Sequence, residues 1–443
     1  MSVHFLRFSK DNSMRFRMLV MAAALAATIG PGVAQADTDA VRPLSLDEAW
    51  RLVEQTNPAL RRKVAQQAVV DGAAQDAGAL LFNNPQFSWD GARRKVPQPN
   101  LSDERYKEWS VGVSQTLEIA GQRGYRLAAA EALRAAHAAE LDALRREVRA
   151  TVAQQFYRVL ALQQRADIEA PALDLFEQTE SAMAKRKAAG EDTKLDANIA
   201  TVEAERARSQ LDAVREQLIE ARAELAATLQ LPTERTADVI GRLAQGLDKP
   251  LPSVDQLLAD LPTQPRLRAF AAQEDSARAR LDLARANRIP DVTLGLGVGR
   301  EGSTEARERL TKLSVSVPLP LFTRNATGVG QARSDLDQAQ IERQAGLRDS
   351  EARIRALIAR LQSLQHRVQR LQDVVAPTLA DNEALSRKSQ RAGQIGLLEL
   401  IVVSRQTLDA RRDLVDALLD FQNTRLALAL AAGLPLNPEE ETR

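Results

Sequence analysis

The sequence predicts a mainly α-helical protein with a small β part, arranged as two internal repeats. Hydrophobic residues make up 44% of the 443 residues but aromatic residues only 4%, a composition typical of long helices. Short landmarks recur in the same order about 205 residues apart, which indicates a repeated architecture. Four short stretches alternate apolar with small or polar residues at period two, which indicates strands.

The N-terminus has the features of an export signal. Arg15 and Arg17 precede an apolar run over residues 18–29, which is too short to span a bilayer. An A-x-A cleavage pattern follows at Ala34 and Ala36. We therefore expect residues 1–36 to be a signal peptide. The alternative, an uncleaved membrane anchor, would need an apolar run of about 20 residues.

Composition narrows the classes of partner and site. The chain has 60 Lys+Arg against 59 Asp+Glu, so no basic field favours nucleic acid as a partner. The absence of Cys excludes a disulfide scaffold, a thiolate metal site and a lipid-anchored N-terminal Cys. His137 and His366 have no second ligand at metal-binding spacing, and no Ser/His/Asp constellation is visible. We expect no enzyme activity, no cofactor and no resident metal.

The two predicted repeats cover residues 37–246 and 247–443 and meet near residues 246–252. One match in a chain rich in Ala and Leu would be expected by chance, but six in order at offsets of 203 to 208 residues would not. The matched pairs begin at Ser45 and Ser253, Asn57 and Gln264, Ser110 and Ser314, Ala170 and Ala376, Gly190 and Gly393, and Leu231 and Leu434.

Each repeat begins with a helix and continues with two strands. Ser45 and Glu48 form a capping-box pattern at the first helix. We expect strands at residues 85–92, 107–117, 290–300 and 310–319. Their alternation suits a strand between lipid and a wet lumen, and it equally suits a soluble sheet resting on a helix. Trp89, Tyr106 and Trp109 fit either an interfacial aromatic belt or a packed core.

A long helical hairpin completes each repeat, over residues 125–230 and 328–432. The first helix of each hairpin spans about 65 residues, or roughly 95 Å, and its apolar residues recur at spacings of three and four, as in coiled coils. Pro171 and Pro377 are expected to bend these helices rather than end them. The hairpin tips fall near residues 190 and 393.

A four-stranded open sheet would leave two unpaired edges in hydrocarbon, at several kcal/mol for each backbone group. The sheet is therefore expected to close with copies of itself. Three chains would give 12 strands, within the range of outer-membrane barrels that hold an aqueous lumen. The arithmetic alone also permits two or four chains.

The sequence has two distinctive strand-to-helix corners, from Ser114 to Arg123 (SQTLEIAGQR) and from Val317 to Asn325 (VPLPLFTRN). Both resemble corners of the outer-membrane factor (TolC) family, and within it those of the branch that serves heavy-metal efflux pumps. Gln122 and Thr323 depart from the Lys and Asp that are usual in this branch.

The resemblance implies a homotrimer with a 12-stranded barrel in contact with outer-membrane lipid and an α-helical barrel in the periplasm. It also implies two partners, a periplasmic membrane-fusion adaptor and an inner-membrane pump of the resistance-nodulation-division (RND) class. We therefore expect a passive exit duct in the outer membrane, for exported substrates such as divalent heavy-metal cations. The alternative is a soluble periplasmic coiled-coil adaptor or scaffold, which would need no glycine-rich alternating strands.

The resemblance also points to functional residues at the two tips. Gly190 and Gly393 match the turns where the family's tunnel narrows, and Asp196 and Glu399 follow each glycine by six residues. A ring of these carboxylates would favour cations, although acids near a helix N-terminus also simply complement its dipole. Cations near the tips would either latch the hairpins together or face the adaptor, and solvated helix faces look the same. These cations are Arg186, Lys187, Lys194, Arg387, Lys388 and Arg391.

Overall fold

The computed structural model describes residues 43–97, 99, 102–191, 193–232, 237–303, 306–392 and 394–437. The predicted signal peptide and the tip residue Gly393 lie outside the described residues. Within them, none of the helices combines the length and the apolar character that crossing a membrane requires.

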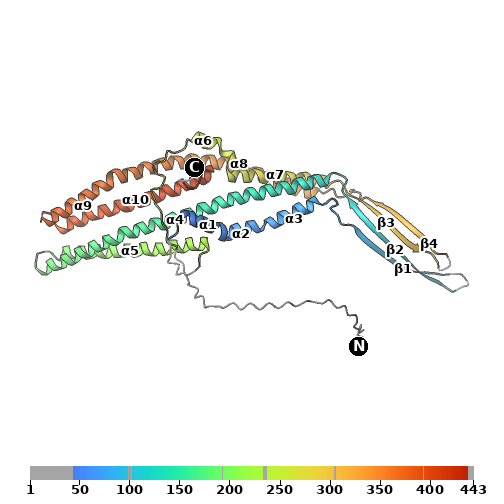
Figure 1. Cartoon of the computed structure of the whole chain (residues 1–443), viewed down its shortest axis with the longest axis horizontal. Coiled ribbons are helices and arrows are strands. Elements are labelled where there is room, and N and C mark those ends of the chain that lie inside the picture. Colours follow the sequence, from blue (N-terminus) through green and yellow to red (C-terminus); the bar gives the residue numbers. More distant parts are fainter. Residues whose placement is uncertain are drawn as a thin grey trace, which may run out of the picture. The chain divides into compact units, whose positions relative to one another are not determined.

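Both repeats follow the same order of shorter helices, two strands and a long helical hairpin (Figure 1). The first repeat consists of α1 (Leu46–Thr56), α2 (Pro58–Ala65), α3 (Gln67–Gly78), β1 (Gln86–Val96), β2 (Glu104–Leu117), α4 (Gln122–Ala188) and α5 (Lys194–Leu229). The second consists of α6 (Val254–Ala259), the short 3₁₀ helix η1 (Leu261–Thr263), α7 (Pro265–Ala286), β3 (Val292–Glu301), β4 (Glu308–Ser316), α8 (Ala326–Arg370), the π-helical segment η2 (Leu371–Val375), α9 (Ala376–Arg391) and α10 (Leu397–Ala432). The predicted fold class, mainly α with a small β part, is confirmed.

The backbone turns in the same way at matching points of the two repeats. Gly121 and Asn325, which precede α4 and α8, both adopt the left-handed conformation, with φ of 73° and 53°. Gln230 and Gly433, which follow α5 and α10, do the same, with φ of 54° and 73°. This conformation favours Gly and Asn, so both repeats leave the sheet and end their hairpins by equivalent turns.

The four strands form one antiparallel sheet in the order β1-β2-β3-β4. The central β2–β3 pair joins the two repeats, and β1 and β4 are the edges. β1 and β2 extend beyond the predicted residues 85–92 and 107–117, because Arg94 and Lys95 pair with Tyr106 and Arg105. In this part of β1 and β2 the residues do not alternate between apolar and polar. The sequence pattern therefore does not indicate that the backbone pairing continues there.

The helices pack around one large core and two smaller clusters. α4 packs against α5, α7 and α10, and α8 packs against α7 and α10. Phe156, Tyr157, Ile354 and Phe421 are among the most buried side chains of the large core. One smaller cluster lies between α7 and α8 and contains Ala277, Leu281, Ala332 and Leu336. The other lies nearer the tips and unites both repeats through Phe176 of α4, Ala204 and Ala207 of α5, and Ile401 and Leu408 of α10.

The two hairpins differ where each contains a proline. Proline lacks the N–H that a helix uses and crowds the preceding turn. α4 continues through Pro171 as one helix, whereas in the second repeat η2 separates α8 from α9 just before Pro377. The π segment widens the helix locally, and such segments occur often at functional sites.

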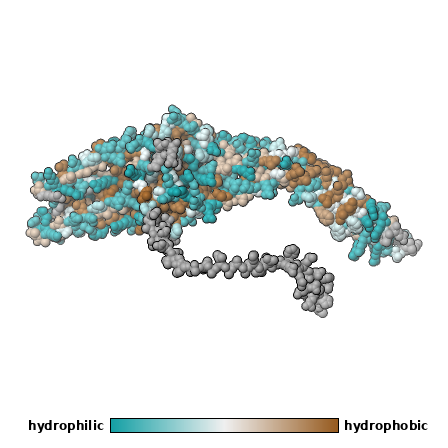
Figure 2. Space-filling model, in the orientation of Figure 1, coloured by the Kyte–Doolittle hydropathy of each residue, from teal (hydrophilic) through white to brown (hydrophobic). Residues whose placement is uncertain are grey.

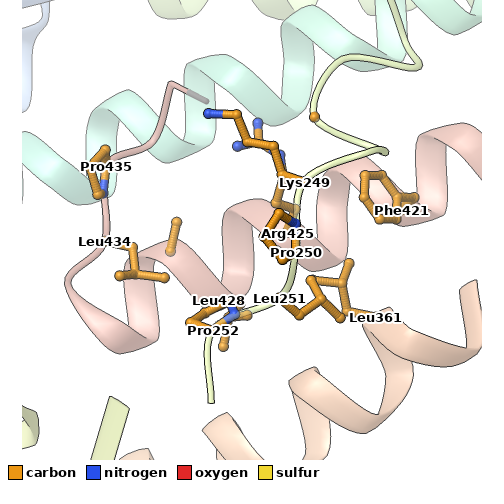
Figure 3. A pocket seen from close by; sticks show the side chains of 12 residues that line it. Lys249, Pro250, Leu251, Pro252, Leu361, Phe421, Arg425, Leu428, Leu434 and Pro435 are labelled. Atoms are coloured by element: carbon orange, nitrogen blue, oxygen red, sulfur yellow. The ribbon is translucent and has the colours of Figure 1, made fainter. Parts of the chain in front are cut away.

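The linker between the repeats is fixed against α8 and α10. The buried Gln422 amide donates hydrogen bonds to the carbonyl oxygens of Leu243 and Gln245, at 2.6 and 2.8 Å. Beside this contact lies a hollow of about 50 Å³, where Pro250 and Leu251 of the linker approach Phe421 (Figure 3). A hollow of this size belongs to the packing of the linker rather than to a ligand site.

Candidate functional sites at the hairpin tips and on the sheet

The first tip is a tight turn followed by a capped helix. Gly190 has φ of 79°, which a side chain would strain. Thr193 caps α5, and its hydroxyl and backbone N–H donate to the Asp196 carboxylate at 2.7 and 3.2 Å. The Asp196 N–H donates back to the Thr193 hydroxyl at 3.2 Å. Asp196 therefore forms a reciprocal capping box at the N-terminus of α5. This contact agrees with the alternative in which the acid complements the helix dipole.

The second tip holds its carboxylate differently. α10 begins after Gly396, which makes no side-chain cap, and Glu399 lies in the first turn and is exposed. The Glu399 carboxylate folds back over Gly396, and a β-carbon at that position would lie 2.6 Å from Glu399 Oε2. Of the two predicted acids, Asp196 thus takes part in a capping box, and among the described contacts Glu399 does not.

The tip cations whose ion pairs the structure describes bind within their own hairpin. Arg186 lies 3.7 Å from Glu191 in the first tip, and Arg387 lies 2.6 Å from Glu383 in α9. Lys187, Lys194 and Lys388 are exposed, and Arg391 is the last residue of α9.

Ion pairs between the two repeats lie further from the tips. Arg412 of α10 forms a bidentate pair with Glu169 of α4, at 2.6 and 2.5 Å, and the Glu169 side chain is 0% exposed. Burial would lower the pKa of the Arg412 guanidinium, but its hydrogen bonds and charge contacts with Glu169 and Asp409 raise it. The sequence analysis did not identify this pair, because acids and arginines are common throughout these helices.

Two further pairs join α10 to the first repeat. Arg165 of α4 donates to Asp416 at 2.8 Å, and Arg405 lies 3.3 Å from Glu203 of α5. Together with Glu169–Arg412, these pairs hold the second hairpin against the first along the half of the hairpins nearer the tips.

The corner between β2 and α4 explains the role of Gln122. Its side chain is 2% exposed and donates to the Ile289 carbonyl at 3.3 Å and to Asp291 at 3.0 Å, which ties the first corner to the second repeat. Burial and the nearby Glu118 raise the pKa of the Asp291 carboxyl. The neutral Gln122 amide can therefore make the contacts that tie this corner to the second repeat, at a position where a lysine is usual in the heavy-metal branch.

Two other carboxylates fasten α7 to its neighbours. Glu140 of α4 accepts hydrogen bonds from Lys63 and from Gln273 of α7, and Glu274 of α7 accepts one from Arg343 of α8 at 2.8 Å. Burial would raise the pKa of Glu140, but the bonds from Lys63 and Gln273 outweigh it and lower the pKa. The hydrogen bond from Arg343 likewise lowers the pKa of Glu274, against the effect of burial.

The sheet has one apolar face and one small or polar face. Phe87, Val113, Leu296 and Leu313 form a row across all four strands and are 53% to 76% exposed. Brown, apolar residues lie over this part of the molecule in Figure 2. Ser88, Gly112, Gly297 and Lys312 form the adjacent row on the opposite face. Trp89 and Trp109 belong to the apolar face and are exposed, so they are not core residues within the described chain.

A family model described as "Outer membrane efflux protein" matches residues 50–229 and 260–434, one segment in each repeat. The chain belongs to the outer membrane efflux protein family. It is therefore an outer-membrane efflux channel with its helical part in the periplasm, and the soluble-scaffold alternative is not favoured. The family is a class of channels rather than a class of enzymes.

Two curated relatives of this family member are a metal-resistance protein and an export protein. The cobalt-zinc-cadmium resistance protein CzcC of Cupriavidus metallidurans is 28% identical over 326 residues, which cover 70% of this chain and 73% of CzcC. The pyoverdine export outer membrane protein OpmQ of Pseudomonas putida is 25% identical over 320 residues, which cover 67% of this chain and 66% of OpmQ.

Solved structures share the efflux-protein fold over most of their length. The crystal structure of VceC from Vibrio cholerae matches with a TM-score of 0.69 and 19% identity, over 88% of this chain and 97% of VceC. The CusC structure matches with a TM-score of 0.70 and 17% identity, over 88% of this chain and 92% of CusC. Among the described residues, no group of three or more His, Asp or Glu side chains is arranged to hold a metal ion.

Proposed function

We propose that three copies of this efflux channel assemble into a passive exit duct with a 12-stranded transmembrane barrel. The observation that carries this proposal is the open four-stranded sheet, whose apolar face is exposed and whose edges β1 and β4 each lack a partner in the described chain. Unpaired strand edges are not tolerated in hydrocarbon, so the sheet closes with identical sheets. Three such sheets fall within the size range of outer-membrane barrels.

Apolar residues at the second corner support contact with a neighbouring copy or with lipid. Leu319, Leu321 and Phe322 are 74%, 71% and 97% exposed. An isolated soluble chain would gain nothing from presenting three large apolar side chains together, and such exposure usually marks an interface.

The exported substrates are divalent heavy-metal cations. The similarity to CzcC supports this substrate class. Asp90 and Glu308 on the polar face of the sheet support it as well, since both are exposed acids for which the described residues provide no ion pair. A lumen lined by carboxylates favours cations because a narrow channel concentrates their field.

The hairpin tips form the regulated periplasmic end of the duct. Glu399 contributes to cation selectivity there, since Asp196 is engaged in its capping box. The exposed cations Lys187, Lys194 and Lys388 face the periplasmic adaptor, through which the duct connects to an RND pump in the inner membrane. Replacing Glu399 by Gln should weaken cation preference and divalent block in single-channel recordings, and unchanged values would reject this role.

The decisive experiment combines mass and transport. The protein purified in mild detergent should have the mass of three chains, and a stable monomer would contradict the proposed duct. Expressed with its cognate pump in a host that lacks its own metal-efflux channel, it should raise the tolerated concentrations of Co²⁺, Zn²⁺ and Cd²⁺ several-fold. Export of pyoverdine without any metal tolerance would instead identify an OpmQ-like substrate.

A further inference from the structure

Beyond the apolar rows, the far end of the sheet carries a second, charged surface. Arg93 of β1 is directly opposite Lys107 of β2, and Arg300 of β3 is directly opposite Arg309 of β4. These four residues, here called the rim cations, lie on the same face as Trp89, because side chains two positions apart in a strand share a face. All four are exposed. Teal residues gather near the far end of the strands in Figure 2.

The charges at this level of the sheet are sorted by face. The acids Glu108, Glu301 and Glu308 occupy alternate positions and so lie on the opposite face. There Glu108 and Glu301 pair with that face's own cations, since Arg94 lies 3.4 Å from Glu108 and Lys312 lies 3.1 Å from Glu301. The face of the rim cations also holds Arg105 and Lys95, and Lys95 pairs with Asp103 at 2.6 Å. Within the described part of the chain, no ion pair involves a rim cation. The surplus of positive charge on this face is complementary to an external anion.

Two of the rim cations, Arg93 and Lys107, border a hollow with aromatic walls. The Trp89 ring lies over Gly91, where a β-carbon would come within 2.8 Å of its Cη2 atom. Trp109 is directly opposite Gly91, and Ala92, Arg93, Lys107 and Glu108 complete the lining of a hollow of about 480 Å³. The lining is apolar at the aromatic rings, and its one acid, Glu108, is paired with Arg94, so Arg93 and Lys107 are its charges without an ion pair among the described residues.

The position of the rim cations relative to a bilayer follows from the strands. Arg93 lies two residues beyond Gly91, a further rise of about 7 Å along the strand from the aromatic level, where lipid head groups begin. The other end of the sheet joins α4 and α8, which belong to the periplasmic part of this outer-membrane channel. The rim cations consequently lie at the level of the outer leaflet.

We propose that the rim cations and the Trp89–Trp109 hollow bind the phosphate groups of a phosphorylated lipid in the outer leaflet. The inference rests on the proposed membrane-spanning barrel. Guanidinium groups bind phosphate oxygens in a bidentate manner, and lysine adds a point charge. The tryptophan rings contact the upper acyl chains, so the site selects a molecule with an apolar body and an anionic head rather than a free anion. Three copies of the site surround each trimer.

The test measures binding of lipid A, which carries two phosphates, to the full-length trimer in detergent micelles. Fluorescence of Trp89 and Trp109 provides the readout. We expect lipid A to bind at least ten-fold more tightly than its fully dephosphorylated form, and the quadruple variant R93Q/K107Q/R300Q/R309Q to lose that preference. The matched control R94Q/K312Q removes two cations from the opposite face and should keep it.

Three results of this binding experiment would overturn the proposal. Equal affinities for the two lipids, or a quadruple variant that binds like the wild type, would show that the rim cations do not recognise phosphate. Competition by millimolar inorganic phosphate would identify a free anion as the ligand. The single variant K107Q, expected to bind two- to four-fold more weakly, serves if the quadruple variant does not fold. The trimer mass is measured first on every sample, so a failure to assemble is distinguished from a trimer that ignores lipid phosphate.

Discussion

At the scale of single residues, Glu169 is the side chain on which the contact between the repeats most depends. Its carboxylate is fully buried, and both oxygens accept hydrogen bonds from Arg412, 243 residues later in the chain. Removing one member of a buried ion pair leaves an uncompensated charge, whereas replacing both by apolar groups is often neutral. The pair therefore constrains how α4 and α10 meet more than it adds net stability.

We expect Glu169→Ala to destabilise the hairpins by about 3 kcal/mol, because Arg412 would remain partly buried without its partner. The double variant Glu169→Leu/Arg412→Met should recover most of this loss. Thermal unfolding monitored by circular dichroism in detergent checks both. Equal melting temperatures for Glu169→Ala and the wild type would mean that the pair contributes nothing, and the exposed pair Arg355–Glu351 supplies a control, where Glu351→Ala should have little effect.

Glu140 and Glu274 make the junction around α7 sensitive to acid. Their folded-state pKa values are lowered, so their stabilising contribution is complete above the unfolded carboxyl pKa of about 4.3 and is lost as pH falls further. The melting temperature should therefore fall steeply below about pH 4. Glu274→Gln should be less stable at pH 7 and show a flatter acid limb, and an acid limb identical to that of the wild type would contradict this assignment.

At the scale of the elements, the glycines of β3 permit close strand approach. A β-carbon at Gly299 would lie 2.9 Å from the Trp109 carbonyl oxygen, which belongs to rigid backbone. Gly299→Val should destabilise the sheet by roughly 1–3 kcal/mol and lower the temperature at which the trimer dissociates on a gel. Gly72→Ala in α3 meets nothing within 4 Å and should be neutral or stabilising. Equal dissociation temperatures for the two variants would contradict the steric argument.

The elements also show which parts of the fold the sequence was able to predict. The alternation from Val292 to Val298 indicates β3 because the two faces of the strand carry different residues, apolar on one and small on the other, and such a difference appears as a period of two. The polar ends of β1 and β2 carry no such pattern. The Glu169–Arg412 contact also could not be predicted from the sequence, because helices rich in acids and arginines offer many equivalent partners. Only the packing of α4 against α10 determines which two residues meet. Gln122 was visible only as a departure from a usual lysine, and its burial explains what it does.

At the scale of the whole molecule, the open sheet predicts that its two edge strands pair between copies. Because the chain contains no Cys, introduced cysteines can test this pairing without competing thiols. If edge β1 of one copy pairs with edge β4 of the next, a cysteine at Ser88 should form a disulfide with a cysteine at one of the same-face β4 positions. Those positions are Glu308, Leu310, Lys312, Ser314 and Ser316.

All five double variants are compared on a non-reducing gel, which also identifies the register between copies. We expect one of them to give a ladder that ends at three covalently linked chains, since a ring of three sheets closes there. Ser114 and Gly295 are directly opposite within one chain, so the control S114C/G295C should form its disulfide without any multimer. Ladders that end at two or four chains would replace the trimer by another ring, and monomers alone in every variant would mean that β1 and β4 do not pair between copies.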